Sequence, residues 1–480
     1  MSGVFEVMQP DPGRLIGALS HIGYRLEDSL SDLVDNAVSA GATQVLIRFL
    51  HDGEHVREIL VADNGTGMTG NEVSEAMRFG SVKSSDPLSL GKFGLGMKLA
   101  SMSYCDELSV YTRKNGSASG RCWTVDGIAA GWMCETIDAP ESKEVLSRPF
   151  AEIDLGVSGT VIRWRNPKNL PTHKSGIRSI IGLIERKLRL HLGMRFHKFI
   201  ERGDLSLMLD QQLEGSPNKP YWIEIDALNP FDYPESGSKS YPKKFTTSDF
   251  AGLGPMTFEA HVWPPKSESE NYRLGKRAAS YQGFFVYRKD RLIQAGGWFG
   301  TVNDEAEPHS SLARIKLDLP ESTEELFALN VQKSTVIPPI GFQDAVRSAK
   351  SHDGTQWEAF RAEAIGVYRG SGLDQKRVKY KLGKGFAISN LGTDGDMVPL
   401  KLKWATKKHA PLVDFDGDAL IFNPGLNDAK NYDSAEKLLA TLGVILVGLL
   451  NDPKNSLRSK EQSAFFKSEL EAAFNEILGS

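Results

Sequence analysis

The stretch SDLVDNAVSAGATQVLIRF, residues 31–49, joins a helical pattern to a strand and carries an unusual number of polar residues on the helix. Apolar residues recur at helical spacing within it and just before it: Leu26, Leu30, Leu33, Val34, Ala37 and Val38. Gly41 is placed to end that helix, and the following residues predict a strand. Yet Asp32, Asp35 and Asn36 stand among the apolar residues, although short polar side chains are poor helix formers.

Two of these polar residues have a spacing that suits chemistry. Asp32 and Asn36 are four residues apart, so they lie on one face of the predicted helix. The amide oxygen of an asparagine is a hard ligand that suits Mg²⁺, and a carboxylate one turn away can accept a proton from an attacking water. Taken alone, the helix is better explained as a solvated polar stripe with local hydrogen bonds.

A second motif, ADNGTGMT at residues 62–69, follows a predicted strand. It places Asp63 at the strand end, where its carboxylate can accept a hydrogen bond from an exocyclic amine such as that of adenine. The glycines of the motif let the backbone come close to a ligand. An ordinary turn after a strand explains the same residues, because Asn-Gly is a common turn pair.

A third motif, GKFGLGMK at residues 91–98, leads into a predicted helix, and a fourth, SGTVIRW at residues 158–164, begins a strand. Backbone N–H groups at a helix N-terminus favour phosphate, and Lys92 and Lys98 add positive charge. A flexible linker before a capped helix is the other interpretation. The chain has neither a Walker A loop nor the glycine pattern of a Rossmann dinucleotide site.

In this order and spacing the four motifs resemble those of the GHKL ATPases, the superfamily of gyrase, heat-shock chaperones, histidine kinases and MutL. The resemblance covers roughly the first 170 residues. It implies an α+β chain with a Bergerat-fold α/β sandwich, whose helices lie on one face of a mixed sheet. It also implies ATP and Mg²⁺ as cofactors.

The resemblance carries a set of site residues onto this sequence. Asn36 would ligate Mg²⁺, and Asp63, supported by the Thr160 hydroxyl, would bind the adenine amino group. The other implied nucleotide-binding residues are Gly65, Gly67 and Met68 on the adenine side, and Lys92, Gly94, Leu95, Gly96 and Lys98 on the phosphate side. Residues 79–90 would form an ATP lid.

The implied catalytic base departs from the superfamily pattern. Hydrolytic members usually carry glutamate four residues before the asparagine, and this chain has Asp32 there. Aspartate is one methylene shorter, but it remains a competent base. Asp28 and Asp35 are further candidates for the same role.

Residues 281–294 and 330–337 resemble the transducer domain, a ribosomal S5-like α/β domain, of MORC-type and MutL-type proteins. In those proteins a lysine reaches back to the terminal phosphate, and Lys333 is the matching residue. Arg288 and Arg291 are expected to be structural. The predicted organisation is an ATP-binding domain at 1–200, a transducer-like domain at 201–350 and a mostly helical or mixed C-terminal region at 351–480. Two helices, near 433–450 and 459–477, would close the chain.

Composition bounds the function only broadly. The 480 residues carry a net charge of -4, which excludes a globally basic nucleic-acid binder. Cys105, Cys122 and Cys134 have no metal-ligand spacing and are expected to be free thiols in a reducing compartment. No signal peptide and no stretch long enough to span a bilayer are visible, so a cytoplasmic location without membrane contact is expected.

The resemblance therefore predicts a slow Mg²⁺-dependent ATPase that acts as an ATP-gated homodimeric clamp or switch. DNA is one candidate partner, because the predicted helix at 176–200 carries a basic set: Arg178, Arg186, Lys187, Arg189, Arg195 and Lys198. Other proteins are further candidate partners, through the C-terminal region. Two alternatives stay open, a non-hydrolysing ATP-gated scaffold and a chaperone-like client-binding ATPase.

Overall fold

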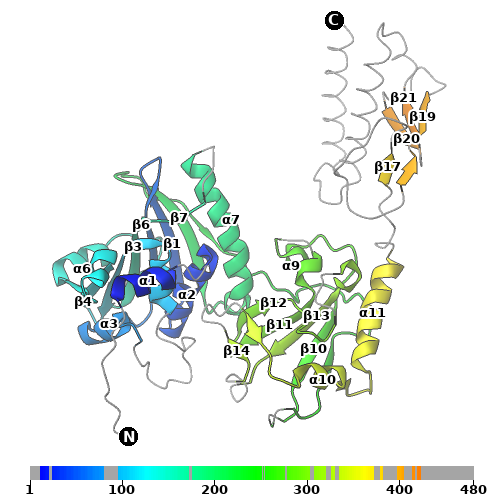
Figure 1. The fold of residues 1–480 in the computed structure, drawn as a ribbon. Helices are drawn as coiled ribbons and strands as arrows, with labels where there is room; N and C mark the ends of the chain where they lie inside the picture. The colour runs from blue at the N-terminus through cyan, green and yellow to red at the C-terminus, as the bar shows by residue number, and fades with distance from the viewer. Residues whose placement is uncertain are drawn as a thin grey trace, which may run out of the picture. The chain divides into compact units, whose positions relative to one another are not determined.

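The computed structural model divides the chain into two compact units, Met1–Leu373 and Asp374–Ser480 (Figure 1). It describes residues 11–20, 24–80, 96–171, 176–250, 252, 254–275, 278–302, 307–320, 326–329, 335–371 and five short strands beyond them. Within the first unit, two sheets with separate hydrophobic cores form two consecutive domains.

The first domain is built on an eight-stranded mixed sheet. In spatial order its strands are β5 (Glu135–Ile137), β4 (Ser117–Thr124), β3 (Cys105–Lys114), β6 (Gly159–Pro167), β2 (Val56–Asp63), β1 (Gln44–His51), β7 (Ser206–Leu213) and β8 (Trp222–Glu224). All neighbours are antiparallel except β1 and β7. The sheet confirms a mixed α+β architecture and the strands that the sequence predicts after the first motif, before Asp63 and from residue 159.

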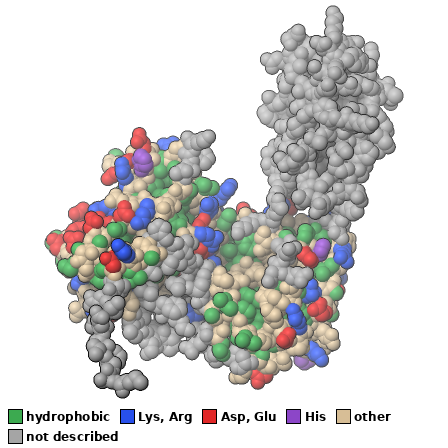
Figure 2. Space-filling view, viewed as in Figure 1, with side chains coloured by type: hydrophobic (Ala, Val, Ile, Leu, Met, Phe, Trp, Pro, Cys, Tyr) green, Lys and Arg blue, Asp and Glu red, His purple; other side chains and the backbone are tan. Residues whose placement is uncertain are grey.

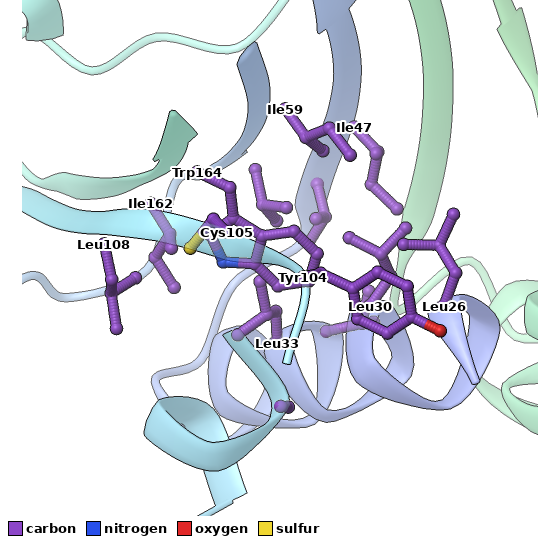
Figure 3. Packing of buried hydrophobic residues seen from close by; sticks show 14 of the residues in the cluster. Leu26, Leu30, Leu33, Ile47, Ile59, Tyr104, Cys105, Leu108, Ile162 and Trp164 are labelled. Carbon is purple, nitrogen blue, oxygen red and sulfur yellow. The ribbon is translucent and has the colours of Figure 1, made fainter. Parts of the chain in front are cut away.

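One face of this sheet carries the main core. Four helices pack there: α1 (Pro12–Ser20), α2 (Leu26–Ser39), α4 (Gly96–Met102) and α7 (Ile177–Arg195). Their apolar stripes meet alternate residues of the strands, because successive strand side chains point to opposite faces. Figure 3 shows Leu30 and Leu33 of α2 against Ile47, Ile59 and Trp164 of the sheet.

The resemblance implied helices on one face of the sheet only, but the opposite face is also covered. Helix α6 (Ala139–Leu146) packs against it with Val145 and Leu146, on a second apolar cluster that includes Leu46, Leu60 and Tyr111. The strands are apolar at consecutive positions, so both faces need cover. Two further helices of the domain, α3 (Gly70–Met77) and α5 (Val125–Ala129), contact β4.

The first domain reaches further along the chain than the predicted boundary at residue 200. Strand β7 lies parallel to β1 and buries Leu207 and Leu209 in the main core, and β8 then pairs with β7. The helix predicted at 176–200 is interrupted at Phe196, so α7 ends at Arg195 and α8 spans His197–Glu201. Parallel pairing across more than 150 residues leaves no local sequence signal.

The second domain holds a six-stranded sheet. Its order is β12 (Arg291–Ala295), β11 (Gly283–Arg288), β13 (Ala313–Asp318), β10 (Thr257–Val262), β9 (Lys243–Thr246) and β16 (Lys350–Ser351). Helices α10 (Phe342–Arg347) and α11 (Trp357–Gly370) cover one face with aromatic side chains. Because α11 packs here, this core extends past the predicted boundary at 350. The domain also has α9 (Glu270–Arg273), η1 (Ala278–Tyr281), η2 (Pro308–Ser310), β14 (Ala328–Leu329) and β15 (Val336–Ile337).

The described part of the C-terminal unit consists of strands. Strands β17 (Lys379–Lys381) and β18 (Met397–Pro399) pair in parallel, and β19 (Lys401–Trp404), β21 (Ala419–Phe422) and β20 (Val413–Asp416) form a three-stranded sheet in that order. The closing helices predicted near 433–450 and 459–477 lie outside the described residues. Among the helices that the structure describes, none is long and apolar enough to cross a membrane.

The three cysteines carry free thiols, as predicted. Cys105 and Cys122 are buried, and Cys134 is half-buried. Burial raises the pKa of all three thiols, that of Cys122 to about 11. They therefore stay protonated near neutral pH and act as small apolar side chains.

Candidate functional site

Three polar side chains lie in a row across the centre of the first sheet. Asp63 on β2 pairs in register with Thr160 on β6, and Thr160 pairs with Thr112 on β3. All three are buried. They continue the alternation of Val61, Ile162 and Val110, which belong to the main core, so they face the side of the sheet that α2 and α4 cover.

Asp63 is the least expected residue of this row, because an ionised carboxylate is costly to bury. Its Oδ1 accepts a hydrogen bond from the Gly65 backbone N–H at 2.9 Å. Its Oδ2 receives no hydrogen bond from any residue that the structure describes. Burial raises the pKa of Asp63 to about 7, and the bond from Gly65 opposes that rise. Within the part of the chain that the structure describes, the second oxygen of this buried carboxylate therefore has no donor.

Thr112 is a site residue that the sequence reasoning missed. Its hydroxyl accepts from the Met68 backbone N–H at 2.8 Å, donates to the Gly159 carbonyl at 3.2 Å and lies 3.3 Å from the Thr160 hydroxyl. It ties the loop after β2 to β3 and β6. The only sequence signal is a threonine that replaces an apolar residue at an inward position of a strand.

The loop after β2 comes very close to the sheet. An added Cβ on Gly65 would lie 2.8 Å from Asp63 Oδ1, and one on Gly67 would lie 1.8 Å from the Arg113 carbonyl oxygen. Asn64, which the sequence reasoning treated as a turn residue, accepts from the backbone N–H groups of Thr43 and Gln44 at 2.9 Å each. At Gly65 and Gly67 a larger side chain would collide with neighbouring atoms, so glycine is required there for space and not only for flexibility.

Replacing Gly67 with alanine tests this close approach. Gly67 has φ +64° and the backbone of Arg113 leaves no room for a methyl group, so we expect a loss of roughly 2 to 4 kcal/mol of unfolding free energy. Gly116→Ala is the matched control, because Gly116 has φ +80° but open space around its Cβ position, and it should cost roughly 1 to 2 kcal/mol. Urea unfolding of both variants measures the difference, and equal losses would contradict the close contact.

Helix α2 brings its polar pair to the same face of the sheet. Asp32 is 2 % exposed, and an added Cβ on Gly96, the first residue of α4, would lie 3.5 Å from its Oδ2. Asn36 is half-buried, and its side-chain amide forms no hydrogen bond with any described residue. The asparagine amide is therefore available to a ligand, with the carboxylate one turn away.

The oxygen atoms of these residues suit a metal ion that binds together with a nucleotide. Among the described residues no group of three or more His, Cys, Asp or Glu side chains could hold a metal ion. Mg²⁺ does not require such a cage, since it usually binds one or two protein oxygens, substrate phosphates and water. The single amide oxygen of Asn36 suits that mode.

The phosphate side of the predicted site is described only in part. Lys92, Gly94 and Leu95 lie outside the described residues, as do lid residues 81–90. Lys98 is buried on α4, and its amino group donates to the carbonyls of Ala76 at 2.8 Å and Arg78 at 2.7 Å. Its charge thus lies at the C-terminal end of α3, where helix carbonyls favour a cation.

The second domain contacts α2 through a residue expected to be structural. Arg291, at the start of β12, pairs with Asp35 through Nε and Oδ1 at 2.5 Å, and its Nη2 donates to the Ser31 hydroxyl at 3.0 Å. Lys333, the predicted contact to the terminal phosphate, lies outside the described residues.

Most basic side chains of the helix predicted at 176–200 are engaged within the chain. Four have carboxylate partners: Lys187 with Glu27, Arg189 with Asp226, Arg195 with Asp28, and Lys198 with Asp290 and Asp318. Arg178 and Arg186 are exposed and form no ion pair with described residues. Figure 2 shows acidic and basic side chains interspersed on the visible face of the described part. The basic set therefore does not form a continuous positive track there.

Comparison with known proteins agrees with this geometry. Residues 24–160 match the family described as histidine kinase-, DNA gyrase B-, and HSP90-like ATPase. This segment contains α2, the loop after β2 and both threonines of the row, so the match covers the part of the chain that carries the candidate site. Among solved structures, the N-terminal domain of a DNA repair protein is similar with a TM-score of 0.43 and 15% identity, over 76% of this chain and 100% of that one. No curated protein matches the chain.

Proposed function

We propose that the first domain binds ATP together with Mg²⁺ and hydrolyses it slowly. The observation that carries the proposal is the buried Asp63 carboxylate, whose Oδ2 has no donor among the described residues and whose neighbours are the hydroxyls of Thr160 and Thr112. An acceptor oxygen in this state takes its donor from water or from a ligand. The family match of residues 24–160 supports a nucleotide as that ligand.

The adenine base supplies a donor to Asp63 Oδ2, which no described residue provides. The exocyclic amino group of adenine donates to Asp63 Oδ2, while Gly65 and Gly67 let the backbone lie against the plane of the base. Thr112 holds Met68 in place through its backbone N–H. Guanine carries an oxygen at the same ring position, and a carboxylate repels it. The site therefore favours ATP over GTP.

The phosphate end of ATP is assigned to α2 and to the start of α4. Asn36 holds the metal through its amide oxygen, and Mg²⁺ neutralises charge on the phosphates when bound. Asp32 accepts the proton of the attacking water, because it lies one turn from Asn36 on the same face. The backbone N–H groups of Gly94, Leu95 and Gly96, with Lys92, bind the phosphates. Lys98 joins them only if its amino group leaves the carbonyls of Ala76 and Arg78.

The finer assignment follows the resemblance to MORC-type and MutL-type ATPases. Residues 79–90 close over bound ATP, Lys333 contacts the terminal phosphate, and two chains pair while ATP is bound. Hydrolysis removes the phosphate contact and opens the pair. Binding of DNA stays a prediction that rests on the resemblance alone. The net charge of -4 does not favour it, and most basic side chains of α7 and α8 are ion-paired within the chain.

Calorimetric titration of the full chain tests nucleotide binding. We expect ATP with Mg²⁺ to bind and GTP to bind roughly 100-fold more weakly, because a site built to accept a hydrogen bond rejects an analogue without the donor. Thr112→Val should weaken ATP binding roughly tenfold, since the Met68 N–H loses its acceptor.

The matched control is Thr136→Val on β5, an exposed threonine of the same sheet. It should leave ATP binding unchanged. Equal affinity for ATP and GTP would contradict the role of Asp63, and no binding of either nucleotide at millimolar concentration would overturn the proposed function.

A further inference from the structure

Helix α2 is held from the second domain at two points one turn apart. Arg291 of β12 contacts Asp35 at 2.5 Å and Ser31 at 3.0 Å. Arg291 is 2 % exposed and Asp35 is 1 % exposed, so the pair is shielded from solvent and salt. A guanidinium with two separate contacts on one helix restrains both its rotation and its sliding.

The two contact points are each adjacent to a residue of the proposed site. Ser31 directly precedes Asp32, and Asp35 directly precedes Asn36. Consecutive residues of a helix differ by about 100° around its axis, so Arg291 contacts the stripe beside the one that carries Asp32 and Asn36. Any shift of the helix relative to Arg291 moves both site residues together.

Arg291 is itself firmly anchored. Its strand β12 pairs with β11, and the neighbouring Leu292 carbonyl accepts a hydrogen bond at 2.9 Å from Arg195 of α7. The guanidinium lies 5.7 Å from the ring centre of Phe196. The contact on α2 is therefore fixed from the second domain and from the end of α7.

We propose that Arg291 is a positioning residue through which the second domain sets the place of Asp32 and Asn36. The inference rests on the proposed function, since it concerns the metal-binding and hydrolytic side of the same nucleotide site. The adenine side is different, because Asp63, Thr160 and Thr112 stand on three strands of the sheet and not on α2. Arg291 thus controls metal use and hydrolysis without controlling recognition of the base.

A double variant provides the cleanest test. Removing Arg291 alone leaves a buried carboxylate without its partner and endangers folding, whereas removing both charges is often close to neutral. We therefore choose Arg291→Met combined with Asp35→Asn. Loss of a group that orients a metal ligand typically costs roughly 10- to 100-fold in metal affinity or activity.

Three quantities are measured on the full chain: the ATP dissociation constant in EDTA, the Mg²⁺ concentration that half-saturates the metal-dependent part of ATP binding, and kcat with KM. In the double variant the ATP dissociation constant in EDTA should stay at the wild-type value. The Mg²⁺ requirement should rise and kcat should fall, each by roughly 10- to 100-fold. Arg291→Lys keeps the charge beside Asp35 but lacks the second guanidinium contact to Ser31, so it should recover only part of the loss.

Asp290→Asn is the matched control. Asp290 lies in the turn of the same hairpin and pairs with Lys198 of α8 at 3.2 Å and with Arg202, directly after α8, at 2.7 Å; both of its ion pairs are thus with the α8 region and not with α2. It should leave the Mg²⁺ requirement unchanged. An equal loss in this control, or a double variant with wild-type Mg²⁺ requirement and kcat, would overturn the positioning role.

The outcomes separate this inference from the proposed function. If the wild-type chain binds no ATP, the proposed function fails and the role of Arg291 fails with it. If the wild-type chain binds ATP and the double variant loses base binding in EDTA to the same extent as Mg²⁺ binding, only the positioning role fails, because Arg291 then supports the whole domain.

Discussion

Asp63→Asn is expected to bind ATP roughly 100-fold more weakly than the wild-type chain and to be the more stable protein at pH 8. Binding falls because a neutral amide is a weaker acceptor than a carboxylate and its NH₂ group can face the adenine amino group. Stability rises because the variant removes a buried charge, while the amide oxygen can still accept from the Gly65 N–H.

The size of the stability effect follows from the pKa. Burial raises the pKa of Asp63 from 3.8 to about 7, which corresponds to about 4 kcal/mol at pH 8, where the carboxyl is ionised in both states. Between these two values the folded chain binds more protons than the unfolded chain. The Asp63 contribution to unfolding free energy is therefore lost as pH rises from about 4 to about 7, and the variant should lack that slope.

Urea unfolding at pH 5 and pH 8, together with ATP titration, measures both effects. Asp154→Asn is the control, because Asp154 accepts from the Gly156 N–H at 2.8 Å in the same local arrangement but is exposed. It should change neither stability nor ATP binding. An Asp63 variant that keeps ATP affinity would remove the central support of the proposed function.

Asp32→Asn is expected to lower steady-state phosphate release by roughly 100-fold or more and to leave ATP binding intact. An amide cannot accept a proton from the attacking water, and general-base catalysis contributes about 10² to 10⁴ in rate. The substitution keeps nearly the same volume in a site where Asp32 is 2 % exposed. Binding and turnover should therefore separate.

The control keeps the carboxylate. Asp32→Glu, which restores the residue usual in hydrolytic members of the resembled superfamily, is expected to retain turnover. Unchanged phosphate release in Asp32→Asn would transfer the role to another group, with Asp28 and Asp35 the further candidates on α2. A wild-type chain that binds ATP and releases no phosphate would favour the ATP-gated scaffold instead.

Much of the first domain was predictable, because its signals are local. The period of Leu30, Leu33 and Ala37 specifies the packed face of α2, and four-residue spacing alone puts Asp32 and Asn36 on one face. The end of β2 at Asp63 and the turn glycines are likewise local features. The extent of the domain was not predictable, because β7 joins β1 across a long interval of sequence.

Which residues repeat at helical or strand spacing, and hence which polar groups share a face, can be inferred from the order of the residues. Which of those faces meet depends on the folded arrangement of the chain. It aligned Thr112 with Asp63 through strand register, and it brought Arg291 to Asp35 across 256 positions. In the folded chain, most basic side chains of the helix predicted at 176–200 form ion pairs. The physical reason is that side-chain period is set by backbone geometry, whereas long-range partners are set by packing and buried charge.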